Sequence, residues 1–392
     1  MTVLTGIDAL LQNGFRWLAG RRIGLLTNPS GVDRQLSSTY DIFRRATEVN
    51  LTAIFTPEHG FAAAAPDAAH IDSTIDRRTG LLVYSLYGQT YRPTAEMLAA
   101  VDVIVCDIQD IGVRYYTYAW TITHILEAAG EAGVEVMILD RPNPLGGITI
   151  AGPPVEPGFE SLVGRFSVPI QPGLTLGELA QLVNATWNPT PAALTVVRCE
   201  NWRRAYTWEQ TGLPWTPTSP AMPHCATVRQ YPGACLVEGT NLSDGRGTAL
   251  PFEIVGAPWI DAPALADHLN AQGWTGVRFR PHTFLPTTSK WRDQTCCGVQ
   301  AHITAPDRWQ PIAVWLGVIR AIRRLYPDQF HWLPPESGGV EAGTVHHFDR
   351  LIGSDQVRQQ IEAGVPLAEI TANWDDFVRA FAEKRQPFLL YD

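Results

Sequence analysis

The sequence contains none of the short motifs that mark the commonest cofactor and nucleophile chemistries. No GxGxxG follows the first predicted strand, which runs into TNPS (residues 27–30), so dinucleotide binding is disfavoured. A P-loop, an HExxH zinc motif and a GxSxG nucleophile elbow are also missing. These absences argue against nucleotide, zinc-peptidase and serine-hydrolase chemistry, and we expect no cofactor.

Cysteine is scarce and is not arranged for metal binding. The six cysteines form no CxxC pair and have no zinc-like histidine spacing, which predicts free thiols in a reducing compartment. Asp67, His70 and Asp72 fit no strong metal motif, and a solvated loop is the favoured interpretation. No metal site is predicted.

Long apolar runs are missing as well. No span of 18 apolar residues occurs, and the N-terminus has neither a basic nor an apolar signal region. A cytoplasmic protein is expected, with export as the alternative if the N-terminus is truncated. The net charge of −9 argues against nucleic acid or an anionic membrane surface as the main partner. Oligomeric state is left open.

The first 150 of the 392 residues alternate strand and helix patterns. Apolar β-formers predict strands at residues 22–27, 51–55, 101–106 and 134–139, and helices are predicted at residues 37–46 and 116–130. This alternation is typical of βαβ units with a mainly parallel sheet. The fold class predicted for this part is α/β.

A proline- and glycine-rich passage, residues 142–172, is the best domain boundary. It divides the chain into a first domain, 1–160, and a second domain, 161–392. Mixed signals predict a smaller α+β second domain, with a strand at residues 194–199 and helices at residues 175–185, 262–272, 311–325 and 355–383.

Polar residues follow all four predicted strands of the first domain. They are Asn28, then Glu58 and His59, then Asp107, Gln109, Asp110, Arg114 and Tyr115, and finally Asp140, Arg141 and Asn143. Ligands of open α/β sheets bind beyond the carboxyl ends of the strands, so these residues predict a ligand site. A polar surface loop is the alternative for any one strand end.

Carboxylates dominate these strand ends, which favours general acid and base chemistry. Glycoside cleavage is one reaction of this kind: it needs an acid to protonate the leaving oxygen and a second group at the sugar.

Long segments of the chain resemble the DUF1343 family. They are TPEHG (residues 56–60), TGLLVYSLYG (79–88), DIQDIGVRYYTY (107–118), LDRPNP (139–144), EGTNLSDGRGT (238–248) and FDRLIGSD (348–355). The resemblance extends from about residue 6 to the C-terminus. It implies an exo-acting β-N-acetylmuramidase of the NamZ type, which releases N-acetylmuramic acid from the non-reducing end of peptidoglycan fragments. It also implies a Rossmann-like domain, a smaller C-terminal domain and an active site in the cleft between them.

The resemblance makes Glu58 the leading catalytic carboxylate, and we predict that it is the general acid. His59 is expected to hydrogen-bond the substrate or to tune Glu58, with a structural role as the alternative. One of Asp107 and Asp110 is expected to act as base or electrostatic partner, the other to cap the next helix or pair with Arg114. After Phe61, the run AAAAPD (residues 62–67) departs from the family, which bears on the substrate range.

The lactyl carboxylate of an N-acetylmuramic acid ligand requires a cationic partner. Arg114, Arg141 and Arg246 are the candidates, with a loop-stabilising ion pair to Asp244 or Glu238 as the alternative for Arg246. The other residues expected at the substrate are Asn28, Tyr115, Tyr116, Asp140, Asn143, Glu238 and Asn241. A cell-wall sugar-binding protein without activity and a carboxylate-dependent esterase or transferase are the alternative functions.

Overall fold

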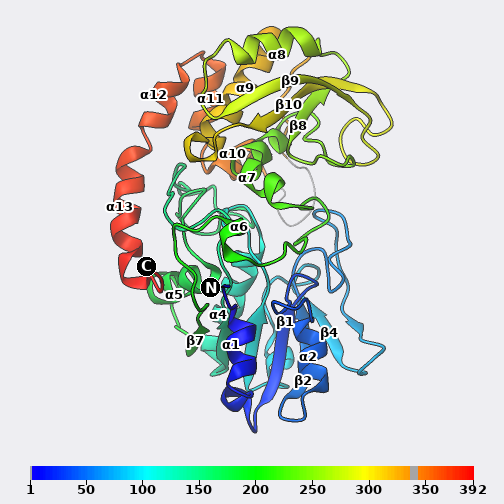
Figure 1. Ribbon diagram of the computed structural model, residues 1–392, viewed down its shortest axis with the longest axis vertical. Coiled ribbons are helices and arrows are strands. Elements are labelled where there is room, and N and C mark those ends of the chain that lie inside the picture. Colours follow the sequence, from blue (N-terminus) through cyan, green and yellow to red (C-terminus); the bar gives the residue numbers. More distant parts are fainter. Residues whose placement is uncertain (1, 336–342) are drawn as a thin grey trace. The chain divides into compact units, whose positions relative to one another are not determined.

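The computed structural model describes residues 2–335 and 343–392. The chain divides into two compact units (Figure 1). The first unit comprises Met1–Thr149, Pro172–His224 and Ala382–Asp392, and the second comprises Ile150–Gln171 and Cys225–Phe381. The boundary proposed from the sequence, near residue 160, lies inside the first segment of the second unit. Each unit therefore contains segments that are distant in the sequence.

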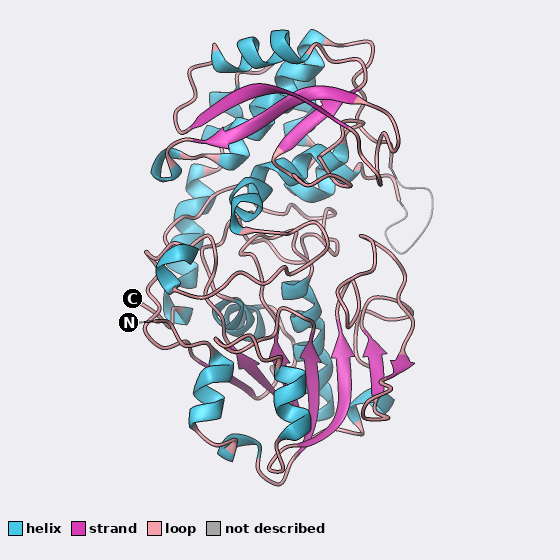
Figure 2. Ribbon diagram, turned by 45° about the vertical axis from the view of Figure 1, so that its right-hand side comes forward, coloured by secondary structure: helices cyan, strands magenta, loops and turns pink. Residues whose placement is uncertain are grey.

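The first unit is built on a seven-stranded sheet in the order β3-β4-β2-β1-β5-β6-β7. Only β3 runs antiparallel to its neighbour, and the parallel arrows in Figure 2 place the carboxyl ends at one edge. The predicted mainly parallel α/β fold is confirmed. The strands are β1 (Arg22–Thr27), β2 (Asn50–Thr56), β3 (Thr74–Ile75), β4 (Leu82–Ser85), β5 (Val103–Asp107), β6 (Glu135–Leu139) and β7 (Leu194–Val197).

Both faces of the central strands are buried, which explains their continuous apolar sequences. Alternate residues such as Leu25 and Val105 form one core with Leu10 and Phe43 from two helices. Ile104 and Ile138 point to the opposite face and are equally buried. The helices of this unit are α1 (Gly6–Gln12), α2 (Thr39–Arg45), α3 (Ala95–Leu98), α4 (Tyr118–Ala132), α5 (Leu176–Thr186) and α6 (Trp208–Thr211).

The strand order reverses direction next to β1. The chain goes from β1 to β2 and β4 on one side, and then from β5 to β6 and β7 on the other. Such a reversal opens a crevice at the carboxyl ends of β1 and β5, where α/β proteins bind ligands.

The second unit contains a three-stranded antiparallel sheet in the order β8-β10-β9, packed against α8. The predicted α+β character is confirmed, but the strand predicted at 194–199 and the helix predicted at 175–185 belong to the first unit, as β7 and α5. The strands and helices of the second unit are β8 (Ile254–Ala257), β9 (Val277–Phe284), β10 (Cys296–Ile303), α7 (Cys225–Ala234), α8 (Ala262–Asn270), α9 (Pro311–Leu325), α10 (His347–Ile352), α11 (Gln356–Glu362) and α12 (Leu367–Ala372). In α13 (Asp375–Arg385) the chain passes from the second unit to the first. The predicted tail helix is thus three helices: Gly364 and Pro366 separate α11 from α12, and Asn373 and Trp374 separate α12 from α13.

All six cysteines are free, as predicted. Within the described residues, no helix is both long and apolar enough to cross a membrane.

Two glycines near the end of α4 test the packing behind the sheet. A Cβ atom at Gly130 would lie 1.8 Å from the carbonyl oxygen of Thr190, whereas one at Gly133 has nothing within 4 Å but needs a φ of 69°. We expect G130A to lower the free energy of unfolding by about 3 kcal/mol, because a backbone atom must move. G133A should cost only about 1 kcal/mol of left-handed strain. Thermal and urea unfolding measure both, and equal losses would contradict the packing described.

Candidate active site

Glu58 lies two residues beyond the end of β2, and its side chain is held by two donors. The amide of Ala68 donates to Oε1 at 2.9 Å, and Thr117 Oγ1 donates to Oε2 at 2.7 Å. Thr117 is the N-cap residue of α4, so the carboxylate faces the positive end of a helix. Glu58 is 8% exposed. It is a buried carboxylate with both oxygens hydrogen-bonded.

His59 holds the loop formed by the residues that follow it, through contacts with residues 64 and 65. Its backbone has a φ of 67°, its Nδ1 donates to the Ala65 carbonyl at 2.8 Å, and its Nε2 lies 3.8 Å from Asp67 Oδ1. The amides of Ala64 and Ala65 donate to its carbonyl oxygen. These contacts favour the structural alternative for His59, which fixes the loop that brings the Ala68 amide to Glu58.

Asp107, the last residue of β5, is completely buried in a salt bridge. Arg141 donates from Nε to Oδ1 at 2.6 Å and from Nη2 to Oδ2 at 2.9 Å, and Thr39 donates to Oδ2 as well. The bidentate geometry suits a buried ion pair. Neither aspartate is the N-cap of α4, which is Thr117, so the capping alternative is wrong; pairing with Arg114 stays a prediction.

Asp110 has a different environment, although it lies only three residues away. The amide of Gly112 donates to Oδ2 at 2.6 Å, but Oδ1 is buried and has no hydrogen-bond partner among residues 2–335 and 343–392. The residue as a whole is half-buried. Burial raises the pKa of this carboxyl to about 7, against the opposing effect of the Gly112 and Ile111 amides. Asp110 can therefore hold a proton near neutral pH.

Two tyrosines respond to the charges of Glu58 and Asp110. The rings of Tyr116 and Tyr118 pack edge to face with their centroids 4.8 Å apart. Burial raises the pKa of both hydroxyls; the charge of Asp110 contributes to the shift of Tyr116, and the charge of Glu58 to that of Tyr118. Each tyrosine is thus within electrostatic range of one carboxyl group.

Thr218 anchors these tyrosines. The Tyr118 hydroxyl donates to the Thr218 carbonyl oxygen at 2.6 Å, and the Thr218 hydroxyl lies 2.6 Å from the Tyr116 hydroxyl. Asn28 Nδ2 donates to the Tyr118 hydroxyl at 3.0 Å, and Asn28 Oδ1 accepts from the Ser30 amide at 2.9 Å. Asn28 positions the tyrosines, and all these side chains are buried.

Asp140 and Asn143, predicted at the substrate, make internal contacts. Asp140 accepts from Thr175 and Tyr391 at 2.7 and 2.6 Å and from the Gly177 amide at 2.9 Å. Burial raises its pKa. Asn143 Nδ2 donates to the Leu174 carbonyl at 2.8 Å. Both side chains hold the first unit together at the end of β6.

Arg114 and Tyr115 are buried in the loop before α4. Burial lowers the pKa of Arg114 to about 10, and the Arg114 carbonyl accepts from Trp120 Nε1 at 2.7 Å.

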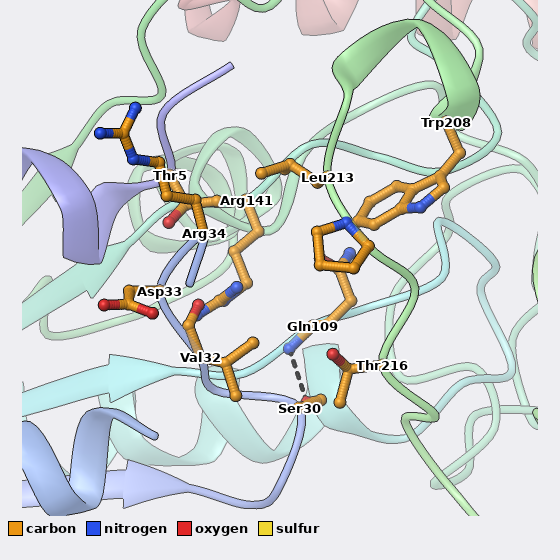
Figure 3. A pocket seen from close by; sticks show the side chains of 11 residues that line it. Thr5, Ser30, Val32, Asp33, Arg34, Gln109, Arg141, Trp208, Leu213 and Thr216 are labelled. Carbon is orange, nitrogen blue, oxygen red and sulfur yellow. Dashed lines mark hydrogen bonds between the residues drawn. The ribbon is translucent and has the colours of Figure 1, made fainter. Parts of the chain in front are cut away.

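A pocket of about 310 Å³, its open mouth included, lies at the carboxyl ends of β1, β5 and β6 (Figure 3). Ser30, Gln109 and Arg141 line it from the three strand ends, and Trp208 lines it from α6. The exposed Arg34 adds a second guanidinium group at this pocket. The crevice expected from the strand order therefore has a polar, partly cationic lining.

Glu238 and Arg246, two of the three residues predicted in the second unit, belong to a partly buried charge cluster. Arg246 Nη1 lies 2.6 Å from Glu238 Oε1 and 3.3 Å from Asp244 Oδ2, as the ion-pair alternative for Arg246 anticipated. Against the effect of burial, Arg246 and His347 hold the pKa of Glu238 well below its usual range.

The rest of this cluster is also structural. Lys290 Nζ lies 3.5 Å from Asp244 Oδ2 and donates to the carbonyls of Val237 and Thr240. Asn241 donates to the Gln329 carbonyl and accepts from the His331 amide.

Thr117 and Thr218 are site residues that the sequence did not reveal. Thr117 could have been found as a capping residue before an apolar helix, but its contact with Glu58 spans 59 positions. Thr218 carries no local signal, because it reaches Tyr118 from 100 residues away.

Two family models match the chain over almost its whole length. The model described as exo-beta-N-acetylmuramidase NamZ, N-terminal, matches residues 23–226, and the C-terminal model of the same description matches residues 229–391. The resemblance inferred from the sequence is confirmed.

Individual relatives agree with the family match. The chain is 42% identical over 389 residues to the peptidoglycan beta-N-acetylmuramidase NamZ of Bacillus subtilis (strain 168), covering 99% of this chain and 91% of that protein. Two crystal structures of DUF1343 family proteins from Bacteroides fragilis superpose with TM-scores of 0.90 and 0.76, at 38% and 30% identity. Each covers 100% of this chain and 99% of the other.

Removal of the Asp107 charge tests the salt bridge. D107N leaves the Arg141 guanidinium buried without its counter-charge, so we expect a loss of about 3–5 kcal/mol in the free energy of unfolding. The double variant D107N/R141M should recover much of that loss, because it also removes the buried cation. Urea unfolding measures both variants, and a D107N protein as stable as the wild type would contradict this account.

The environment of Asp110 predicts a pH-dependent stability. Its pKa is about 7 in the folded protein and ordinarily 3.8, so ionisation above pH 4 favours the unfolded chain. Stability is therefore lost as the pH rises through 7. D110N stays neutral at all these pH values. The Tm of D110N minus the Tm of the wild type should therefore increase between pH 4 and pH 7 and stay constant above pH 7. A difference in Tm independent of pH would refute the raised pKa.

Proposed function

Because the chain belongs to the exo-beta-N-acetylmuramidase NamZ family, we propose that it is an exo-acting glycoside hydrolase. It releases N-acetylmuramic acid from the non-reducing end of peptidoglycan-derived fragments. The observation that carries this proposal is the 42% identity to the Bacillus subtilis enzyme over 99% of the chain. Such hydrolysis uses two carboxyl groups and requires no cofactor.

Glu58 supplies one of these carboxyl groups. It lies at the carboxyl end of β2, close to the reversal point of the sheet, and is fixed by the Ala68 amide and Thr117. Rigid placement of this kind is what a catalytic group requires. Thr117, Tyr116 and Tyr118 position the groups around it.

The substrate also carries a lactyl carboxylate, which needs a cationic partner. Arg34 and Arg141 both line the pocket of Figure 3. Arg141 donates to Asp107 from Nε and Nη2, so its Nη1 can donate to a further acceptor. These two arginines, rather than the internally paired Arg246, are our candidates for the lactyl group.

Two other functions use the same residues differently. A binding protein for cell-wall sugars would retain the pocket without turnover, and an esterase or transferase would use Glu58 as a base. Cleavage of the glycosidic bond distinguishes these functions, because only the hydrolase releases both N-acetylmuramic acid and the adjoining sugar.

Turnover of nitrophenyl N-acetyl-β-muramide by the wild type and E58Q tests the proposal. We expect the wild type to release nitrophenol and E58Q to lose about 10²–10⁴-fold in kcat, because an amide cannot exchange the proton or carry the charge. Binding of N-acetylmuramic acid, measured by calorimetry, should persist in E58Q.

E96Q is the matched control, since Glu96 is exposed in the first turn of α3. It should retain full activity. A wild type that cleaves the corresponding N-acetylglucosaminide but not the muramide would defeat the assignment of the lactyl group. An intact muramide together with hydrolysis of nitrophenyl acetate to acetate and nitrophenol would favour the esterase.

A further inference from the structure

The proposed hydrolysis divides its work between a carboxyl group that holds a proton and one that is ionised. The environments of Glu58 and Asp110 differ in this respect. Both oxygens of Glu58 accept hydrogen bonds, one of them from a backbone amide that can only donate. Hydrogen bonds to a carboxylate favour its charged form.

Asp110 has the opposite arrangement. Its Oδ2 accepts one hydrogen bond from Gly112, whereas Oδ1 is shielded from solvent and has no partner in the described chain. An unpartnered, desolvated carboxylate oxygen is costly, and a proton on that oxygen removes the cost. The residue as a whole is partly exposed.

The other buried carboxyl groups at the strand ends do not offer this combination. Asp107 is neutralised by Arg141, and Asp140 has both oxygens occupied by Thr175, Gly177 and Tyr391. Among the strand-end carboxyl groups of the described residues, only Asp110 combines partial exposure with an unpartnered oxygen.

Glu58 and Asp110 both lie at the carboxyl edge of the sheet. They follow β2 and β5, which flank β1. Two strand spacings, about 10 Å, separate the ends of these two strands. The charge of Asp110 acts on Tyr116 and that of Glu58 on Tyr118, and the two tyrosine rings pack edge to face.

We propose that Asp110 is the proton donor of this site and that Glu58 works in its ionised form. This assignment rests on the proposed function and replaces the general-acid role predicted for Glu58. The proton of the Asp110 carboxyl group moves to the glycosidic oxygen as the C1–O bond breaks, and the bonding electron pair stays with that oxygen. Water adds to C1, and Glu58 takes its released proton. The raised pKa of Asp110 agrees with this role.

Leaving-group dependence tests the assignment in the full-length protein. A substrate with an acidic leaving group needs little protonation, whereas a disaccharide needs a proton donor. The wild type, D110N and E58Q are compared on dinitrophenyl N-acetyl-β-muramide and on a disaccharide of N-acetylmuramic acid and N-acetylglucosamine. D110N should lose about 10²–10⁴-fold in kcat/KM on the disaccharide and less than about 10-fold on the aryl substrate. E58Q should lose activity on both.

D110N keeps the acceptor for the Gly112 amide, so the loop is retained, and unchanged or higher thermal stability checks its fold. D261N is the matched control: Asp261 caps α8 in the second unit through the Ala264 amide, and its conversion to asparagine should change neither rate.

The outcomes separate this assignment from the proposed function. A wild type inactive on both muramides overturns the proposed function and the assignment with it. With an active wild type, equal losses of D110N on the two substrates, or no loss, overturn the assignment alone. So does an E58Q protein that still cleaves the aryl substrate, because that pattern identifies Glu58 as the proton donor.

Discussion

The buried pair of Asp107 and Arg141 is the interaction on which the arrangement of the strand ends depends. It joins the last residue of β5 to the residue that follows Asp140 beyond β6, while Arg141 Nη2 donates to the Val32 carbonyl and Thr39 to Asp107. Three strand ends are thereby fixed around one neutralised charge. Because both ions are desolvated, either one alone would be strongly unfavourable, and the loops between them are held in one geometry.

This pairing explains how two aspartates on one short loop can have different chemistry. Asp107 has a permanent cation, and its charge is satisfied inside the protein. Asp110 has desolvation without a cation, so its neutral form is favoured. Glu58 has amide and hydroxyl donors instead. One edge of the sheet thus presents three carboxyl groups in three environments: one is paired with a cation, one is desolvated, and one is held by an amide and a hydroxyl donor.

The sequence predicted the features that depend on local patterns. The bounds of β1 agree because an apolar run ends at Asn28-Pro29, and α2 begins after a serine cap as expected. Strands β8, β9 and β10 were missed, because Gly256, Pro281 and Gly298 interrupt the usual pattern of β-formers. The clustering of polar strand ends was predictable, but the difference between Asp107 and Asp110 was not. It depends on Arg141, 34 residues further on, and on oxygen burial, which no local pattern encodes.

The contacts of the last residues have a consequence for biosynthesis. Tyr391 donates to Asp140, the Leu390 amide to Glu178 and the Arg204 amide to the carbonyl of Asp392, all within the first unit. The first unit is therefore completed by residues that are translated after the second unit. A nascent chain must keep the buried carboxyl groups of Asp140 and Glu178 incompletely paired while the second unit is being translated. Strictly domain-by-domain folding, with the first unit finished before the second is made, is therefore excluded.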